Sequence, residues 1–187
     1  MDDLQQLLNN IWTELTQSCT TKNHPYRTPV VGTINGQYSC ELRTVVLREV
    51  NRLAHTLTFF TDLRSGKVKD MSLNPTLSWL FYDPTTQVQI RASGDSLLIK
   101  DSKILQNYWD RLPENNRKEY ASSQAPGSSI ENNFTSNLLS NKESFKNFGV
   151  VVSEINKVDW LKLNPFQHQR ALFEKEEGKW NKTQIVP

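Results

Sequence analysis

The sequence predicts a mainly β fold, a β-barrel with flanking helices, and three observations lead to it. Six to eight short β-rich runs recur along the 187 residues. Turn signals such as Asn35-Gly36 and Glu177-Gly178 separate neighbouring runs. The main helical patterns lie at the start, after the run near residue 60, and in the middle. Short antiparallel strands of this kind usually close into a barrel, because closure removes unpaired edges.

The first half of the chain alternates a helix, strands and a second helix. Leucine and isoleucine recur three and four residues apart near the start, which predicts one apolar helix face. Asn35-Gly36 between two apolar runs predicts a hairpin, and Pro75 is expected to stop a short helix. The expected elements are a helix over 2–17, two strands within 28–50, a strand over 56–61 and a helix over 64–74.

The second half is expected to return to strands after a central helix. Asp83-Pro84 marks a turn between two strands, and Gly94 predicts a bulge or bend in the second of them. A Ser- and Asn-rich loop follows the central helix, either as a lid over a site or as a tolerated insertion. The expected elements are strands over 76–82 and 87–99, helical residues 101–120, a variable loop over 121–147 with a short helix near 135–146, a strand pair over 148–163, and a final hairpin.

Composition indicates one domain, 1–187, without a nucleic-acid or membrane partner. The 22 basic and 20 acidic residues give a net charge of only +2, unlike a typical nucleic-acid-binding protein. No run approaches the roughly 18 apolar residues of a membrane span, and the acidic amphipathic start is unlike a signal peptide. Cys19 and Cys40 form no metal-binding spacing and are expected to be reduced thiols, so we expect a cytoplasmic protein without a metal.

Cationic and hydroxyl side chains cluster around the two β-rich runs of residues 41–69. Arginine offers forked donors, lysine a point charge, and serine and threonine short hydroxyl donors, a set that suits a phosphate. The start of the expected helix over 64–74 also favours an anion. The alternative is a solvated charge run. The cluster consists of Arg43, Thr44, Arg48, Thr61, Arg64, Ser65 and Lys67.

Five short motifs then occur in order and at suitable spacing: RTVVLR (43–48), FFTDLRSGK (59–67), NP (74–75), WLFY (79–82) and QVQI (87–90). Together they resemble the antiparallel FMN-binding split barrel of pyridoxamine 5′-phosphate oxidases and their relatives. The similarity extends over about residues 25–187, including Pro126-Gly127 after the central helix. It implies FMN as the cofactor and a homodimer with two sites at its interface.

The resemblance also implies roles for individual residues. Arg43 and Lys67 would hold the FMN phosphate, and Gln87 would hydrogen-bond the polar edge of the flavin. The partner subunit would supply Trp160 and Arg170. The full implied cofactor set is Arg43, Thr44, Val45, Val46, Leu47, Arg48, Phe60, Thr61, Arg64, Ser65, Lys67, Gln87, Trp160 and Arg170.

The substrate would be a small molecule, in the named candidate a phosphorylated pyridine. Arg48 and Tyr108, with Arg111 or Arg117, would bind it, and His168 is the candidate proton donor. Phe166 departs from the family, because the oxidases carry there an arginine that covers the substrate ring.

Phe60 and Gly66 are further departures, since a tyrosine and an arginine are common at these positions. The sequence therefore predicts an FMN-dependent oxidoreductase, or alternatively a non-catalytic FMN-binding carrier, sensor or stress-related protein. A third reading is a barrel that binds haem or a deazaflavin.

Overall fold

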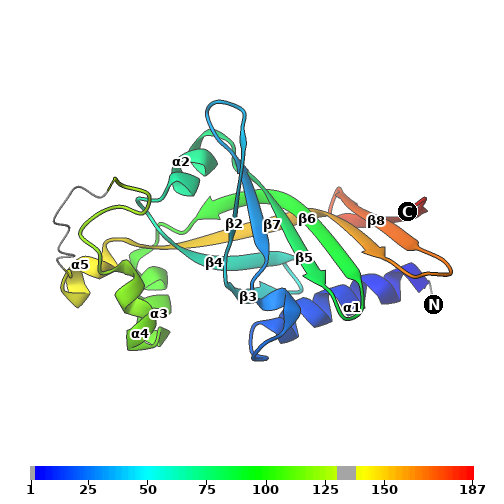
Figure 1. Ribbon diagram of the computed structural model, residues 1–187, viewed down its shortest axis with the longest axis horizontal. Helices are drawn as coiled ribbons and strands as arrows, with labels where there is room; N and C mark the ends of the chain where they lie inside the picture. The colour runs from blue at the N-terminus through cyan, green and yellow to red at the C-terminus, as the bar shows by residue number, and fades with distance from the viewer. Residues whose placement is uncertain (1–2, 130–137) are drawn as a thin grey trace.

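A computed structural model describes residues 3–129 and 138–187, in which nine strands form one antiparallel sheet (Figure 1). The strands are β1 (Val30–Ile34), β2 (Cys40–Thr44), β3 (Leu47–Asn51), β4 (Thr56–Asp62), β5 (Thr76–Asp83), β6 (Val88–Leu98), β7 (Phe148–Lys162), β8 (Gln169–Glu176) and β9 (Lys179–Ile185). The sheet runs in the order β2-β1-β5-β6-β7-β4-β3, with β8 pairing to β7 and β9 to β8. The predicted antiparallel β fold with flanking helices is thereby confirmed.

The sheet curls around one core in the manner of a barrel. Phe59 of β4 and Trp79 of β5 have ring centroids 5.6 Å apart, although β6 and β7 separate their strands in the sheet. The indole N–H of Trp79 donates to the Ser153 hydroxyl of β7 at 3.3 Å. The long strand β7 allows the sheet to curl, because its first half pairs with β4 and its second half with β8. The largest aromatic side chains thus fill the interior.

A bulge in the middle of the sheet lies at Gly94, as the sequence predicts. The register of β6 against β7 shifts between Ser93 and Gly94, which leaves Asn156 without an opposite residue. A β-carbon on Gly94 would overlap the carbonyl of Glu154 and lie 2.8 Å from the α-carbon of Ile155. Glycine is therefore required here by the close approach of two backbones.

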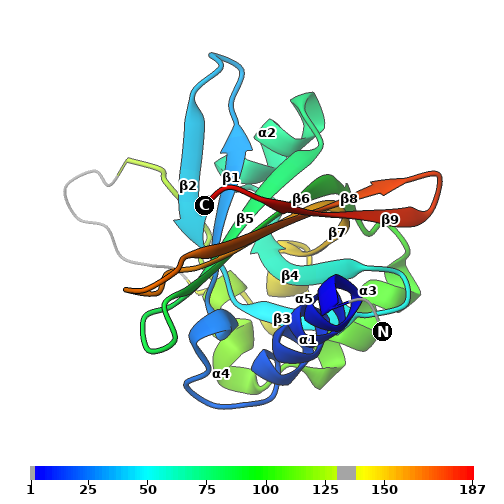
Figure 2. The ribbon, with the colours of Figure 1, turned by 90° about the vertical axis from the view of Figure 1, so that its right-hand side faces the viewer.

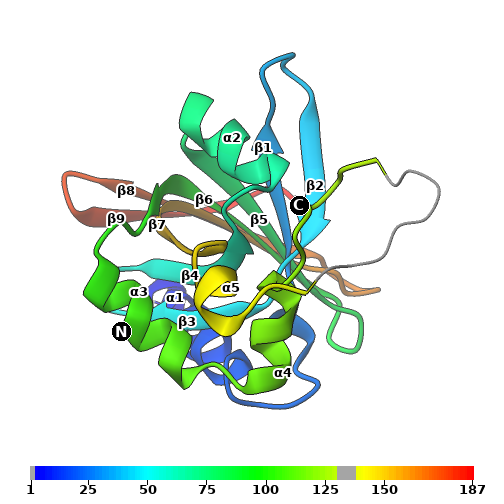
Figure 3. The ribbon, with the colours of Figure 1, turned by 90° about the vertical axis from the view of Figure 1, so that its left-hand side faces the viewer.

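Helices cover one side of the barrel and one end of it. The helices are α1 (Asp3–Ser18), α2 (Gly66–Leu73), α3 (Ser102–Arg111), α4 (Glu114–Arg117) and α5 (Asn141–Phe145), with 3₁₀ turns at Pro25–Arg27 and Lys118–Tyr120. In Figure 1, α1 runs along the sheet, and in Figure 2 it is seen nearly end-on beside β3 and β4. Its buried face, including Trp12 and Leu15, joins the main core. Figure 3 shows α3, α4 and α5 gathered at the other end, where Trp109, Tyr120 and Phe148 form a second, smaller core.

Two sequence predictions of secondary structure are wrong. Residues 148–163 form the single strand β7 rather than a strand pair, because the polar stretch at Asn156 is the bulge and not a turn. The second strand expected within 28–50 is divided into β2 and β3, with Val45 and Val46 between them. The expected helix near 135–146 lies partly outside the described residues, and α5 forms its end. No helix in the described ranges is both long and apolar enough to cross a membrane.

Candidate functional site

Two hydroxyls and an ammonium group meet where β4 ends and α2 begins. Thr61 is near the end of β4, and Ser65 occupies the position that precedes α2. Their hydroxyl oxygens lie 3.2 Å apart, and Lys67 Nζ donates to Thr61 Oγ1 at 3.2 Å and to Ser65 Oγ at 3.3 Å. The side chain of Ser65 does not cap the helix, and the Val68 N–H donates to the Ser65 carbonyl at 3.0 Å. The N–H groups of Gly66 and Lys67, at the start of α2, therefore point toward the end where an anion would bind.

The positive charge of the Lys67 ammonium group is only weakly neutralised by the groups around it. Burial lowers its pKa, and the nearby Arg43 lowers it further, while Asp62 opposes the shift. Its two hydrogen-bond partners are neutral hydroxyls, and among the described residues no carboxylate forms an ion pair with it. Two cations and two hydroxyls in one place are a donor set that suits a phosphate.

Arg43 approaches the same place from β2, but its guanidinium is shared with other groups. It donates from Nη1 to Thr33 Oγ1 and to the Glu41 carbonyl, each at 2.6 Å. The Thr33 hydroxyl donates to Asp70 of α2 at 2.7 Å, and Arg43 Nη2 lies 3.8 Å from that carboxylate. Asp70 therefore orients Arg43, and the guanidinium keeps further N–H groups for a ligand.

Arg64 does not point its donors at this cluster. It forms a two-pronged pair with Asp62, from Nε to Oδ1 at 3.0 Å and from Nη2 to Oδ2 at 2.7 Å. Nη1 donates to the carbonyls of Ser122 and Ser123 at 3.0 and 3.3 Å. The hydrogen bond and charge of Asp62 raise the pKa of the guanidinium. A direct contact of Arg64 with a phosphate stays a prediction that this geometry does not favour.

A cavity of about 230 Å³ opens beside Lys67, and six of the predicted cofactor residues line it. Arg48 is the notable member, because its Nε is buried and has no hydrogen-bond partner among residues 3–129 and 138–187. The guanidinium carbon lies 5.3 Å from the centre of the Phe60 ring, and burial lowers the pKa of the group. A buried donor without a partner is costly, which indicates a missing acceptor. The lining consists of Thr28, Thr44, Val45, Val46, Arg48, Phe60, Lys67, Glu119 and Tyr120.

A second cavity of about 230 Å³ lies on the other side of Arg48 and Phe60. It brings together Arg48, Tyr108 and Arg111, the three residues predicted to bind substrate. The guanidinium of Arg111 lies 4.9 Å from the Tyr108 ring centre, and the Tyr108 hydroxyl donates to Glu49 at 2.9 Å. Arg117 instead donates to the Trp109 and Asp110 carbonyls and is not part of this cavity lining.

The remaining predicted residues lie away from both cavities. Gln87 is exposed in the turn between β5 and β6, with a backbone φ of 54°. His168 is exposed, and its Nδ1 accepts from the Asn164 N–H at 3.1 Å, which leaves Nε2 as the donor of the neutral ring. Trp160 packs against the main core, and the fully buried Leu47 belongs to it. None of these four residues lines either cavity, and their implied flavin contacts stay predictions.

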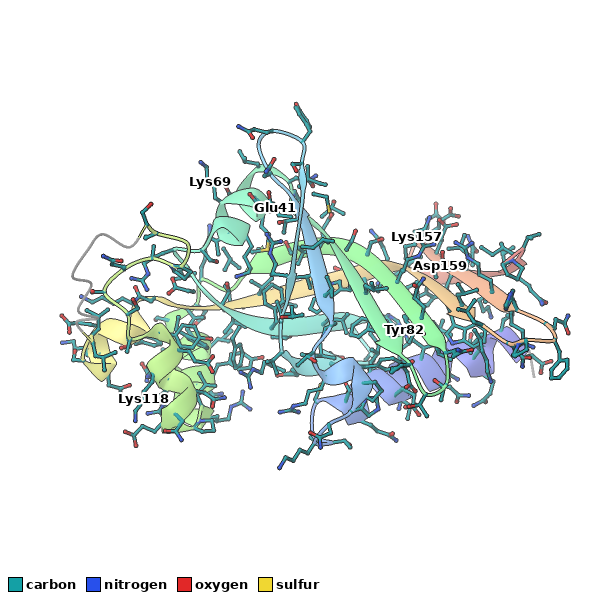
Figure 4. All side chains as sticks on the ribbon, in the orientation of Figure 1. Glu41, Lys69, Tyr82, Lys118, Lys157 and Asp159 are labelled. Atoms are coloured by element: carbon teal, nitrogen blue, oxygen red, sulfur yellow. The ribbon has the colours of Figure 1, made fainter. Side chains whose placement is uncertain are left out.

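Arg170 belongs to a charged group on the outer face of the sheet. It donates to Asp159 from Nε at 3.0 Å and from Nη2 at 2.8 Å, and Arg91 also binds this carboxylate. Burial alone would raise the pKa of Asp159, but the two guanidinium groups lower it overall. Figure 4 shows Asp159 toward the β8 end of the molecule and Lys118 at the opposite, helical end.

The outer face around this group is hollow and largely apolar. A cavity of about 680 Å³ extends along β1, β2, β5, β6, β7 and β8. Leu42 and Leu80, which line it, are 68% and 37% exposed. An apolar surface of this extent on a sheet commonly marks a contact with another protein.

Several lining residues could not be found from the sequence. Thr28, Glu119 and Tyr120 enter the first cavity from segments that carry no motif, and Arg27 and Glu49 enter the second. The bulge between Leu47 and Glu49 turns both Arg48 and Glu49 toward the same cavity, which strict strand alternation would not predict.

Comparison with known proteins shows which proteins this chain is similar to. A family model described as "Pyridoxamine 5'-phosphate oxidase, FMN-binding domain" matches residues 9–100, which include every residue of the Lys67 cluster. A pyridoxine/pyridoxamine 5'-phosphate oxidase of Aeromonas hydrophila is 23% identical over 182 residues, covering 92% of this chain and 85% of the relative. The same-named protein of Escherichia fergusonii is 22% identical over 184 residues, covering 92% and 83%.

Solved structures show the same fold. A pyridoxamine 5'-phosphate oxidase-related, FMN binding protein from Nostoc punctiforme superposes with a TM-score of 0.76 at 22% identity, over 95% of this chain and 96% of that one. PhzG from Burkholderia lata, solved with tetrahydrophenazine-1-carboxylic acid, gives 0.73 at 16% identity, over 98% and 92%. Residues 9–100 are thus similar to the FMN-binding domain of pyridoxamine 5'-phosphate oxidases, and the chain has the fold of proteins related to these oxidases.

Proposed function

We propose that this protein binds FMN, with the phosphate at Lys67 and the flavin along the cavity lined by Thr44, Val45 and Val46. The observation that carries the proposal is the Lys67 cluster, a half-buried cation with neutral hydroxyl partners in a family whose domain binds FMN. The buried Nε of Arg48 also needs an acceptor in the same cavity. A phosphate or a flavin carbonyl would satisfy these donors.

The chain's own residues would bind and orient the cofactor rather than form bonds to it. FMN supplies the redox chemistry when bound, by accepting a hydride or an electron pair. Thr61 and Ser65 would accept from Lys67 and hold its ammonium group at the phosphate, while the Ser65 hydroxyl itself donates to the Asp62 carbonyl. Asp70 would hold Arg43 in position. Phe60 and Tyr120 provide apolar walls that exclude water from the cavity.

The proposed activity is that of an FMN-dependent oxidoreductase acting on a small molecule with an anionic group, in the first case a phosphorylated pyridine. The cavity that joins Arg48, Tyr108 and Arg111 supports this site, since it meets the cofactor cavity at Arg48 and Phe60. The guanidinium groups would bind the anion and the aromatic rings would pack on the pyridine. We place this activity in the cytoplasm, as the two free cysteines, Cys19 and Cys40, lead us to expect.

A homodimer is part of the proposal. Within one subunit, Arg170 and Trp160 do not line the cavity beside Lys67, so their implied role needs a second copy of the chain. The apolar outer face around Leu42 and Leu80 provides a surface for that copy. His168, whose Nε2 remains a donor, would then act near the partner's flavin.

Oxygen consumption tests the proposed activity directly. Purified protein loaded with FMN is incubated with pyridoxamine phosphate or pyridoxine phosphate, and oxygen uptake and pyridoxal phosphate are measured. We expect the parent protein to turn over one of these substrates and Arg48→Met to do so more slowly. This variant keeps the approximate volume of the side chain but removes the charge. FMN binding without turnover of either substrate would reject the oxidase assignment.

Phe166 supports a second function, in which the protein is an FMN-binding carrier, sensor or stress-related protein without turnover. Phe166 stands where the family oxidases cover the substrate ring with arginine, and its side chain is 97% exposed. This function predicts tight FMN binding with no substrate-dependent reduction of the flavin. Phe166→Arg provides the comparison, because a gain of oxidase activity in this variant would show that the exposed ring is what limits turnover.

A further inference from the structure

Arg64 joins two segments that are distant in the sequence. Its guanidinium is held by Asp62 through two hydrogen bonds, and the Arg64 N–H also donates to Asp62 Oδ1 at 2.8 Å. The third guanidinium nitrogen reaches the carbonyls of Ser122 and Ser123. One side chain therefore uses all three of its nitrogens within the protein, and two of its acceptors come from nearly 60 residues further along the chain.

Other hydrogen bonds reinforce the same junction. Asn147 Nδ2 donates to the Tyr120 carbonyl at 2.9 Å, and the Leu63 N–H donates to the Asn147 carbonyl at 2.8 Å. The turn between β4 and α2 is thus attached to the segment 120–123 at two places. Tyr120, the first residue of that segment, is also a wall of the cavity beside Lys67.

The junction continues directly into the Lys67 cluster. Asp62, whose carboxylate holds Arg64, accepts at its backbone carbonyl from Ser65 Oγ at 2.7 Å and from the Ser65 N–H at 3.1 Å. Ser65 Oγ in turn accepts from Lys67 Nζ. Because Asp62 and Ser65 are both buried, a displacement of Asp62 would move the hydroxyl and the ammonium group with it.

We propose that Arg64 is a positioning residue for the phosphate of FMN. It fixes the turn 62–65 against the segment 120–123, and this fixed turn holds Ser65 and Lys67 at the phosphate without a contact from Arg64 itself. The inference rests on the proposed FMN site. It assigns Arg64 a role through its neighbours, in place of a direct phosphate contact.

Paired titrations with FMN and riboflavin test the proposal, because the two ligands differ only in the phosphate. Flavin fluorescence is followed for the full chain, for Arg64→Ala, and for Lys69→Ala as the matched control. Lys69 is an exposed cation on α2, so its removal changes the local charge by the same amount without touching the turn. We expect Arg64→Ala to weaken FMN binding by about tenfold or more and to leave riboflavin binding unchanged. We expect no change for Lys69→Ala.

Hydrogen exchange of the flavin-free protein separates positioning from direct contact. If Arg64 holds the segment 120–123 in place, the backbone amides of this segment and of the adjoining residue 124 exchange faster in Arg64→Ala than in Lys69→Ala before any ligand is added. Arg64→Lys keeps the charge but cannot form the fork, so it should fall between the two in both measurements. This variant carries the test if Arg64→Ala does not fold.

The outcomes that overturn the inference are distinct. Unchanged FMN affinity in Arg64→Ala, an equal loss of FMN and riboflavin binding, or unchanged exchange at 120–124 would each reject the positioning role alone. If the unaltered protein binds no FMN, the proposed function fails and this inference fails with it.

Discussion

Replacement of Lys67 by methionine separates the binding role of its charge from its structural role. Methionine keeps an unbranched stem of similar length, so the packing around the start of α2 is preserved while the ammonium group is lost. Among the described residues, that group donates hydrogen bonds only to two neutral hydroxyls, at 3.2 and 3.3 Å. Lys67→Met therefore removes little that the flavin-free protein uses.

The expected loss is large for FMN and small for riboflavin. A hydrogen bond to a charged group contributes about 1.5–3 kcal/mol, which corresponds to roughly a 10- to 150-fold weaker Kd for FMN. Riboflavin lacks the phosphate and should bind both proteins equally. Fluorescence titration of the parent protein and of Lys67→Met with each flavin gives the ratio of the two Kd values for FMN and for riboflavin.

The stability of the flavin-free protein should not fall in the same variant. Burial and the nearby Arg43 lower the pKa of Lys67, so the folded state disfavours the charged form relative to the unfolded chain. The charged lysine thus lowers stability at neutral pH, and stability rises as the pH rises through the lowered pKa toward the ordinary value of 10.5. The thermal midpoint of Lys67→Met is therefore expected to equal or exceed that of the parent. Unchanged FMN affinity, or an equal loss of both flavins, would refute the phosphate assignment of Lys67.

Three further predictions concern the fold and the assembly. Gly94→Ala should lower the free energy of unfolding by about 2 to 4 kcal/mol, measured by chemical denaturation, because a β-carbon would overlap the Glu154 carbonyl; a neutral effect would contradict the close approach. His55 accepts a hydrogen bond from the Trp180 indole at 3.2 Å, and its pKa is lowered mainly by burial and also by Lys175. The free energy of unfolding should therefore fall as the pH drops from about 6.5 through that lowered pKa. A stability that does not change with pH, or the same pH dependence in His55→Gln, would contradict this. Asp159→Asn should weaken the proposed dimer in light scattering, because two guanidinium groups lose their shared anion, and an unchanged mass would contradict a role for this face.

Local features of the fold and site follow from the sequence because they depend on neighbouring residues. The end of α2 before Pro75 and the bulge at Gly94 each reflect a backbone preference of the residues involved. The hairpin at Asn35-Gly36 also forms, although its connection is five residues long and the positive φ falls on Tyr38. Thr61, Ser65 and Lys67 were also predictable together, since they lie within seven residues along one strand end and one helix start.

Long-range features do not follow in the same way. Asp70 orients Arg43 through Thr33, a contact between residues 37 apart that no motif announces. Arg64 is predicted to bind phosphate because its neighbours in the sequence are Ser65 and Lys67. In the structure its guanidinium instead donates to Asp62 and to the carbonyls of Ser122 and Ser123. Tertiary packing brings these partners together, and it overrides the local pattern.

The length of β7 shows a related effect. Polar residues around Asn156 resemble a turn, but pairing with β6 continues on both sides of the bulge and keeps the strand extended. The neighbouring strands, rather than the propensity of the residues, decide the conformation here.

A visible absorption spectrum of the purified protein, followed by titration with FMN, tests the central claim most directly. We predict flavin bands and saturable FMN binding that weakens in Lys67→Met and in Arg43→Ala, with riboflavin much less affected. A haem or deazaflavin spectrum, or the absence of any FMN binding, would contradict the proposed site.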